Sequence, residues 1–170
     1  MFLGVIFSRM VPPVSFIIPF VIIFGNLGLK DTQLSLIITN TFFCLPFAIW
    51  VMKPFFDGVP SELEDAARID GCDKIQLFFR VLLPIVKPGI TAAAILSFLF
   101  SWKEFLFALV LTATKAKTLP IGLTDFFIDE YIEWNRLAAA STISIIPAII
   151  FVVLFQRYLI RGMLAGSVKG

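Results

Sequence analysis

The residues best placed to carry chemistry lie in one charged segment, Ser61 to Gly89, which reads SELEDAARIDGCDKIQLFFRVLLPIVKPG between apolar runs. The chain has no histidine, which is the commonest metal ligand and the usual base near neutral pH. Its two cysteines, Cys44 and Cys72, are isolated and suggest neither a disulfide framework nor a zinc site. A G-x-x-x-x-G-K phosphate loop is absent from the sequence. We therefore expect no catalytic residue, metal or cofactor on this chain, and interpret the segment as a contact for another protein.

Two short helices are predicted within a loop covering residues 54–87. Ser61 can cap the first helix, and Glu64, three residues later, would complete a capping box. Gly71 is expected to end this helix, because glycine readily turns through positive φ. One apolar face of the helix carries Leu63, Ala66 and Ala67, and its two small alanines allow close approach to another surface.

The second helix should begin near Asp73 and end at Pro84, before a turn at residues 87–89. Its apolar stripe has helical spacing and consists of Ile75, Phe78, Phe79 and Leu82. Burying four such side chains is worth roughly 6–12 kcal/mol at about 1.5–3 kcal/mol each, so we expect the stripe to be covered. The helix could lie on the membrane surface as an amphipathic anchor. Alternatively, two helices joined at Gly71 form a docking element, which also explains the first helix.

The elements that must hold this segment are membrane helices. Of 170 residues, 59% are hydrophobic and 15% charged, whereas soluble domains have roughly 45–50% and about 25%. This composition predicts an all-α, polytopic membrane helix bundle, because lipid offers no partners for unpaired backbone groups. We treat residues 1–170 as part of a single transmembrane domain. Four transmembrane helices are expected, near residues 2–25, 33–52, 88–113 and 138–159.

The ends and the basic residues set further expectations. The chain begins within an apolar run that has no polar leader, as an amino-terminally truncated protein would. With Arg9 and Lys103 set aside as intramembrane candidates, eight of the remaining twelve lysines and arginines share one side with the central loop and the carboxyl terminus. The positive-inside rule then predicts that this side is cytoplasmic.

Lys103 and Glu104 fall near the middle of the third predicted span. Each would cost roughly 2.5–3.5 kcal/mol if it faced lipid, so both should face the bundle or a wet cavity. They could line a translocation path, with Trp102 stacking on a sugar face. They could equally form a structural ion pair or polar contact, with Trp102 serving only for packing.

The central segment resembles the EAA loop of ABC-type importer permeases, whose pattern is Glu-Ala-Ala, three residues, Gly, nine residues, Ile, one residue, Leu-Pro. The matching positions are Asp65, Ala66, Ala67, Gly71, Val81, Leu83 and Pro84. Asp65 and Val81 are conservative departures, and Lys103 stands where asparagine is common. Further matching pieces are RMVPP at 9–13, LPFAIW at 45–50, WKEFLFAL at 102–109, TLPIGL at 118–123 and QRYLIRGMLAGSVKG at 156–170. The chain is similar to the carbohydrate-uptake branch, in particular to the second membrane component of maltose transporters, and matches the last four of six spans.

The resemblance implies a set of partners: ATP-binding cassette ATPase subunits, a sister permease, an extracytoplasmic substrate-binding protein and membrane lipid, without nucleic acid. It implies a multi-pass protein of a bacterial or archaeal plasma membrane. The ATPase-coupling contact would comprise Glu64, Asp65, Ala66, Ala67, Asp70, Gly71, Leu83 and Pro84. The tail, which by itself reads as a frayed end, would reach the ATPase through Arg161, Gly166 and Lys169. The outer loop 114–136 would dock the binding protein.

The expected function is thus that of a permease subunit in a binding-protein-dependent importer of sugars or sugar-like solutes, working by alternating access. ATP would be hydrolysed on a separate subunit. Two alternatives stay open: an importer for a non-sugar solute, and a membrane scaffold that only binds a soluble partner through its central loop.

Overall fold

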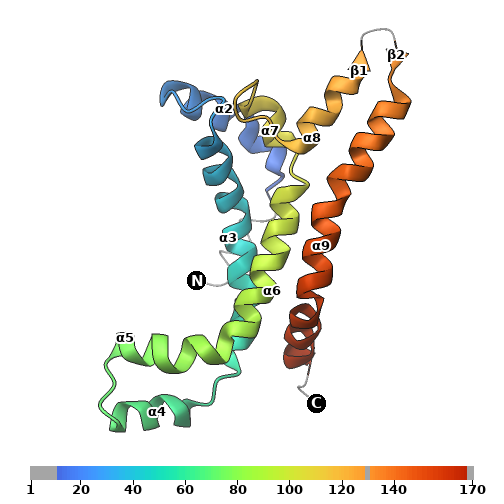
Figure 1. Cartoon of the computed structure of the whole chain (residues 1–170). Coiled ribbons are helices and arrows are strands. Elements are labelled where there is room, and N and C mark those ends of the chain that lie inside the picture. Colours follow the sequence, from blue (N-terminus) through green and yellow to red (C-terminus); the bar gives the residue numbers. More distant parts are fainter. Residues whose placement is uncertain (1–10, 129–130, 168–170) are drawn as a thin grey trace. The chain divides into compact units, whose positions relative to one another are not determined.

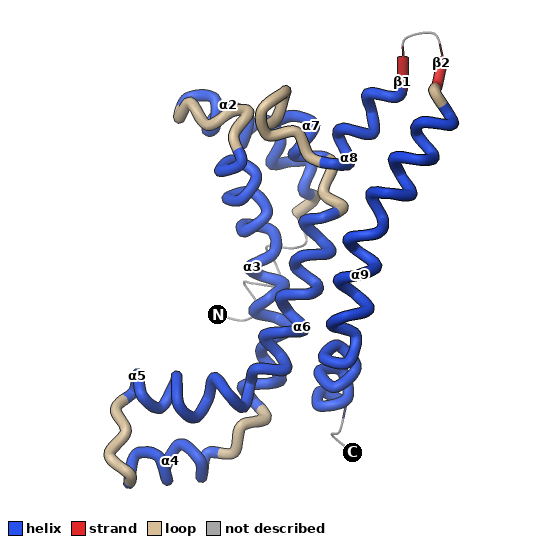
Figure 2. Tube along the Cα trace, viewed as in Figure 1, coloured by secondary structure: helices blue, strands red, loops and turns tan. Residues whose placement is uncertain are grey.

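The computed structural model describes residues 11–128 and 131–167, with side chains described for 11–127 and 132–156. Almost all of this part is helical, with two short strands (Figures 1 and 2). The elements in chain order are η1 (Pro13–Phe16), α2 (Ile17–Asn26), α3 (Gln33–Asp57), α4 (Ser61–Ile69), α5 (Lys74–Gln76), η2 (Leu77–Leu82), α6 (Leu83–Trp102), α7 (Leu106–Leu111), α8 (Leu119–Gly122), η3 (Leu123–Phe126), β1 (Phe127–Ile128), β2 (Tyr131–Ile132) and α9 (Trp134–Ser167). The predicted all-α membrane architecture is confirmed, and β1 and β2 form one antiparallel pair beside it.

Within the described ranges, three helices are long and apolar enough to cross a membrane. They are α3, the continuous helix Lys74–Trp102 formed by α5, η2 and α6, and α9 over Trp134–Gln156. These correspond to the second, third and fourth predicted spans. The first predicted span, residues 2–25, is described only from residue 11, where Pro13–Asn26 form a shorter apolar helix.

The prediction of one unbroken helix over residues 88–113 is wrong, because α6 ends at Trp102 and α7 begins at Leu106. The Glu104 carboxylate accepts hydrogen bonds from the backbone N–H groups of Phe107, at 2.7 Å, and Ala108, at 3.0 Å. These donors belong to the first turn of α7, where the helix itself provides no acceptor. Glu104 therefore caps a new helix instead of occupying the middle of a span.

The predicted helix end at Pro84 and turn at residues 87–89 are also wrong, since the helix runs on without interruption. Pro84 is the second residue of α6 and, inside this continuous helix, lacks the N–H of a regular backbone hydrogen bond. It follows η2, a stretch of wider, π-helical geometry. Pro88 lies inside α6 and removes one backbone hydrogen bond without ending the helix.

The chain divides into two compact units, residues 1–46 with 98–151 and residues 47–97 with 152–170. The first unit has an aromatic core in which Phe24 and Phe107 are buried together with Leu111. The Phe107 ring stacks on Phe43, with centroids 4.9 Å apart, and lies 5.7 Å from Phe20. Such ring pairs add stability beyond the area they bury, so Phe107 ties α7 to α2 and α3 within this unit.

In the second unit, α6 has one buried face that includes small residues. Val86 is fully enclosed, and Gly89 and Ala93 continue the same face at helical spacing. Ile95 is also buried. Small side chains at this spacing let helices approach closely, which is how membrane helices gain packing contacts where lipid provides little hydrophobic driving force.

Replacing Phe107 by alanine should destabilise the solubilised protein, because the deletion leaves a cavity where rings met on two sides. Buried Phe-to-Ala changes cost about 3–5 kcal/mol. The measurement is the thermal midpoint in detergent. Phe105→Ala is the matched control, since Phe105 lies two residues away and is 40% exposed. Equal midpoints for the two variants would contradict this account of the core.

Candidate functional site

The site most clearly set apart by its geometry is the central arm, which we define as α4, α5 and η2, Ser61–Leu82. Its first helix starts as predicted, but not with the predicted cap. Pro60 occupies the capping position and makes no side-chain hydrogen bond, so the Ser61–Glu64 capping box is wrong. Proline, whose fixed φ suits a helix start, leads directly into the first turn. Glu64 instead lies 3.6 Å from Arg68 on the next turn of α4.

The end of α4 follows the prediction. Gly71 has a φ of +80°, and the N–H of Cys72 reaches back to the carbonyl of Ala67 at 3.0 Å. The N–H of Asp70 donates to the Ala66 carbonyl at 3.0 Å. This pattern closes a helix with a left-handed residue just past its end, and a side chain at that position would be strained.

The second helix of the arm starts with a complete capping box. The N–H of Gln76 donates to Asp73 Oδ1 at 2.7 Å, and the N–H of Asp73 donates to Gln76 Oε1 at 3.3 Å. Helix α4 contacts η2, and each contributes one buried apolar side chain, Ala67 and Leu77. The arm is therefore a helix–turn–helix with both turn ends fixed by hydrogen bonds.

Most of the other side chains of the arm are exposed, although Leu82 of the predicted stripe is half-buried. Ile69 is 87% exposed and Ile75 is 69% exposed, so large apolar side chains stand open. Phe78 and Phe79 are also exposed and meet edge to face, with centroids 5.1 Å apart. The predicted burial of the stripe is not provided by the described residues of this chain. The arm thus leaves large apolar side chains exposed.

Acidic side chains share the exposed face. Glu62, Asp65 and Asp70 are open to solvent. Arg68 lies 3.5 Å from Asp65, but pairs this exposed contribute little to stability. The charges are therefore available for contacts to a partner.

The predicted coupling residues do not all occupy equivalent positions. Ala66 is exposed beside the acidic residues, whereas its neighbour Ala67 packs inside the arm. Leu83 is half-buried and Pro84 is exposed, both in the first turn of α6. Their contact role stays a prediction.

The predicted tail contact falls largely outside the described side chains. Lys169 lies beyond the described residues. Arg161 and Gly166 belong to α9, of which only the backbone is described there. The tail contact therefore also stays a prediction.

The predicted translocation-path residues lie at the α6–α7 break. Trp102 ends α6 and packs on Phe98, with ring centroids 5.5 Å apart. Lys103 is exposed, and both oxygens of Glu104 are engaged by α7. The three residues are neighbours in the chain, but their contacts differ. Glu104 caps α7, and Trp102 takes part in aromatic packing. A role in the path stays a prediction.

A second polar arrangement, which the sequence reasoning missed, surrounds Asp31 between α2 and α3. Its carboxylate accepts backbone N–H groups from four consecutive residues after α7: Ala113 at 2.8 Å, Thr114 at 3.2 Å, Lys115 at 3.1 Å and Ala116 at 3.2 Å. Its own N–H donates to the Leu111 carbonyl at 2.8 Å. Asp31 has a φ of 57°, which aspartate tolerates better than most residues. We call this arrangement the Asp31 clip.

The clip stabilises the ionised carboxylate. The N–H groups of Ala113 and then Lys115 hold the pKa of Asp31 far below its ordinary value, and those of Thr114 and Ala116 act in the same direction. Successive N–H groups converging in this way form a small anion-binding concavity, here filled by a side chain of the same chain. The segment that follows α7 is thereby fixed to the α2–α3 turn.

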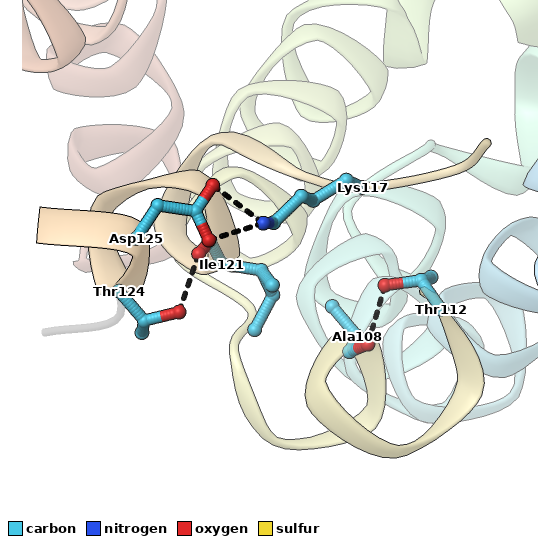
Figure 3. A network of polar contacts seen from close by, with 6 residues as sticks. All are labelled: Ala108, Thr112, Lys117, Ile121, Thr124 and Asp125. Carbon is cyan, nitrogen blue, oxygen red and sulfur yellow. Dashed lines mark hydrogen bonds and ion pairs between the residues drawn. The ribbon is translucent and has the colours of Figure 1, made fainter. Parts of the chain in front are cut away.

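The predicted outer loop continues from the clip through short helices (Figure 3). Lys117 pairs with Asp125, and the hydroxyl of Thr124 donates to the Ile121 carbonyl at 2.7 Å. Further along, Arg136 lies 2.9 Å from Glu133. Of the acidic residues in this loop, Asp129 and Glu130 lie outside the described residues. Ion pairs and a hydrogen bond link some of the described residues of this loop, and its docking role stays a prediction.

Comparison with known proteins identifies the family. A model described as the binding-protein-dependent transport system inner membrane component matches residues 1–165, and the chain therefore belongs to this family. It is 40% identical over 164 residues to a trehalose transport system permease protein of Mycobacterium tuberculosis, covering 95% of this chain and 60% of that protein. It is 37% identical over 170 residues to an arabinooligosaccharides transport system permease protein of Halalkalibacterium halodurans, covering 99% of this chain and 60% of that one.

A solved structure agrees with the fold. The chain superposes with a TM-score of 0.74, at 25% identity, on a chain of a bacterial ABC transporter involved in the import of the acidic polysaccharide alginate. The match covers 92% of this chain and 60% of that one. The chain thus spans about 60% of the length of these relatives.

Replacing Glu104 by alanine should loosen the start of α7, because two backbone N–H groups lose their acceptor. Caps of this kind are worth about 1 kcal/mol, so hydrogen exchange of the Phe107 and Ala108 amides should accelerate roughly five- to tenfold. Glu104→Gln, which keeps one acceptor oxygen, should lie between. Lys103→Ala is the control and should leave both amides unchanged; unchanged exchange in Glu104→Ala would refute the cap.

Replacing Asp31 by asparagine should lower the thermal midpoint, because a neutral amide binds the four N–H groups more weakly. Since the folded pKa is lowered, the ionised clip contributes stability above the unfolded pKa of about 3.9, and that contribution is lost as pH falls through the folded value. The midpoint difference from wild type should therefore stay constant between pH 8 and pH 5 and shrink only in stronger acid. Asp125→Asn, at an exposed ion pair, is the control; a difference that already fades between pH 7 and pH 5 would contradict the assignment.

Proposed function

We propose that this chain is the permease subunit of a binding-protein-dependent, ATP-driven importer of carbohydrates, and that its central arm is the contact with the ATPase. The observation that carries the proposal is the arm itself. Two short helices meet at a left-handed glycine, are closed by hydrogen bonds at both ends of the turn, and leave acidic and apolar side chains exposed. A surface of this kind suits a protein groove better than lipid, because exposed carboxylates are costly in an apolar medium.

We infer a division of labour between this chain and its partners. ATP would bind and be hydrolysed on separate cytoplasmic subunits, since the sequence lacks a phosphate loop. Closure of those subunits would carry the arm with them. Movement of the arm would shift α3 and α6, which lead into and out of it, and so switch the substrate path between its two openings. A sister permease would supply the other half of that path.

Contacts on the two membrane faces would differ. The ATPase contact would involve Glu64, Asp65, Ala66, Ala67, Asp70, Gly71, Leu83 and Pro84. The tail residues Arg161, Gly166 and Lys169 would add to it. On the opposite face, the outer loop fixed by the Asp31 clip would receive the substrate-binding protein. We propose a plasma-membrane location with the arm and the carboxyl terminus in the cytoplasm.

The names of the relatives favour a carbohydrate cargo. They mention trehalose, trehalose or maltose, arabinooligosaccharides and sulfoquinovosyl glycerol, each as the substrate of that relative's own system. The competing proposals are import of a non-sugar solute and a scaffold that binds a partner without transport.

Copurification and uptake separate these proposals. The full-length protein is isolated from its native membrane under mild detergent, and its partners are identified by mass spectrometry. Uptake of radiolabelled trehalose, maltose, an arabinooligosaccharide and an amino acid is then measured in cells with and without the gene. An ATPase, a second permease and sugar uptake support the proposal; amino-acid uptake alone indicates a different solute, and a bound soluble partner without any uptake indicates a scaffold.

Replacing Gly71 by proline should uncouple ATP hydrolysis from transport while leaving insertion intact. Proline cannot adopt the observed φ of +80° and would also remove the N–H that Gly71 donates to the Arg68 carbonyl at 3.0 Å. The two arm helices should then no longer meet at the same angle. Uptake should fall by at least about tenfold, as a coupling loss of more than about 1.4 kcal/mol implies.

Gly71→Asn is the matched control, because asparagine is tolerated in left-handed conformations. It should retain most uptake and bind the same partners. The coupling role of this turn would be wrong if Gly71→Pro imported sugar at the wild-type rate.

A further inference from the structure

The helices on either side of the central arm make one unusually close contact within the second unit. Phe55 lies in the last turns of α3, just before the arm, and Gly89 lies in the first turns of α6, just after it. A Cβ added to Gly89 would lie 2.5 Å from the Cγ and Cδ2 atoms of Phe55 and 2.9 Å from its Cδ1 atom. Atoms in real structures do not approach so closely, so the ring packs directly against the glycine backbone. We call this contact the Phe55–Gly89 joint.

The joint lies next to an irregular stretch of the helix that leaves the arm. Between residues 77 and 82 the helix has the wider π geometry. Pro88 lacks an N–H, so the carbonyl of Pro84 loses its usual partner four residues on. Irregularities of this kind are where helices bend. Without a supporting contact, this part of the helix would bend when a partner displaces the arm.

Gly89 immediately follows Pro88. The Phe55 ring therefore supports the helix just after the point where its hydrogen bonding is interrupted. The buried face continues there through Val86, one turn earlier, and Ala93, one turn later. Only glycine leaves room for an aromatic ring at this distance. The contact joins the incoming and outgoing helices of the arm at the level where the outgoing one is least rigid.

We propose that the Phe55–Gly89 joint makes the arm and the adjoining parts of α3 and α6 move as one rigid piece, so that displacement of the arm reaches the membrane helices instead of being absorbed by bending near Pro88. Phe55 and Gly89 are thus positioning residues for transport. The inference deepens the proposed function and rests on it, since it assumes that a partner displaces the arm.

The test measures the distance between spin labels on the arm and on α6 in the full-length complex reconstituted in lipid. Labels are placed at Lys74 and Ala94, both exposed and both outside the proposed ATPase contact, after the native cysteines have been replaced. In the otherwise wild-type protein the distance distribution should be narrow and identical without nucleotide and with ATP and vanadate. In Phe55→Ala and in Gly89→Ala it should broaden and shift with nucleotide, because the arm then moves while α6 lags.

The double variant tests the contact directly. Phe55→Ala removes the ring with which the methyl group introduced by Gly89→Ala would collide, so Phe55→Ala/Gly89→Ala should give a distribution no broader than that of Phe55→Ala alone. Matched controls are Phe56→Ala, an exposed neighbour of the same type, and Gly122→Ala, where an added Cβ meets nothing within 4 Å. Both should behave as wild type. Wild-type distributions in both single joint variants, or additive broadening in the double variant, would overturn the proposal.

The same samples separate failure of the joint from failure of the proposed function. Recovery of the ATPase subunit is measured on every preparation. If wild type binds no ATPase, the proposed function fails. The distances between the spin labels without nucleotide still report whether the joint stiffens the helix that leaves the arm. If the ATPase is bound and nucleotide leaves the distances of the joint variants unchanged and narrow, the joint alone is wrong.

Discussion

Every interruption of a helix in an apolar chain leaves backbone N–H or carbonyl groups that lipid cannot satisfy, and the architecture of this protein depends on how those groups find partners. Between α6 and α7, both oxygens of Glu104 accept N–H groups of the new helix. After α7, four more N–H groups converge on Asp31. In the central arm, Gly71 and the Asp73 capping box perform the same task. The carboxylates of Glu104, Asp31 and Asp73 are therefore structural acceptors.

This constraint also separates fixed parts from parts available for contact. The carboxylates of Glu104 and Asp31 already accept hydrogen bonds from the backbone of this chain, which makes them poor candidates for binding a solute. The acidic residues of α4 are not engaged in this way, because their ion pairs with Arg68 are long and exposed. The arm thus combines a rigid backbone with free surface chemistry. A contact that transmits movement requires both a rigid backbone and exposed side chains that can bind a partner.

The arm could be predicted from the sequence because its signals are local. Gly71 ends a helix because glycine itself readily adopts positive φ. Asp73 and Gln76, which form the capping box, lie only three residues apart. The Asp31 clip could not be predicted, because its donors lie more than 80 residues away and only the fold brings them together. The same holds for Phe55 and Gly89.

Two other predictions differ from the structure. A proline commonly ends a helix, but at Pro84 the helix continues, directly after a π-helical stretch in which the regular hydrogen-bonding pattern already changes. Glu104 was expected to sit inside a span because the surrounding sequence is apolar throughout. Its place three residues before Phe107, where a carboxylate can reach the first turn of a helix, was the signal that could have located the break.

The central claim, that the arm contacts an ATPase, is tested most directly by photo-crosslinking from Ile69, which is 87% exposed at the tip of the arm. A photoreactive residue is introduced there in the full-length protein, and native membranes are irradiated with and without ATP and vanadate. The account predicts a cross-link to an ATP-binding subunit whose yield changes with nucleotide. Cross-links to lipid alone in both conditions, with the ATPase present in the same membranes, would contradict it.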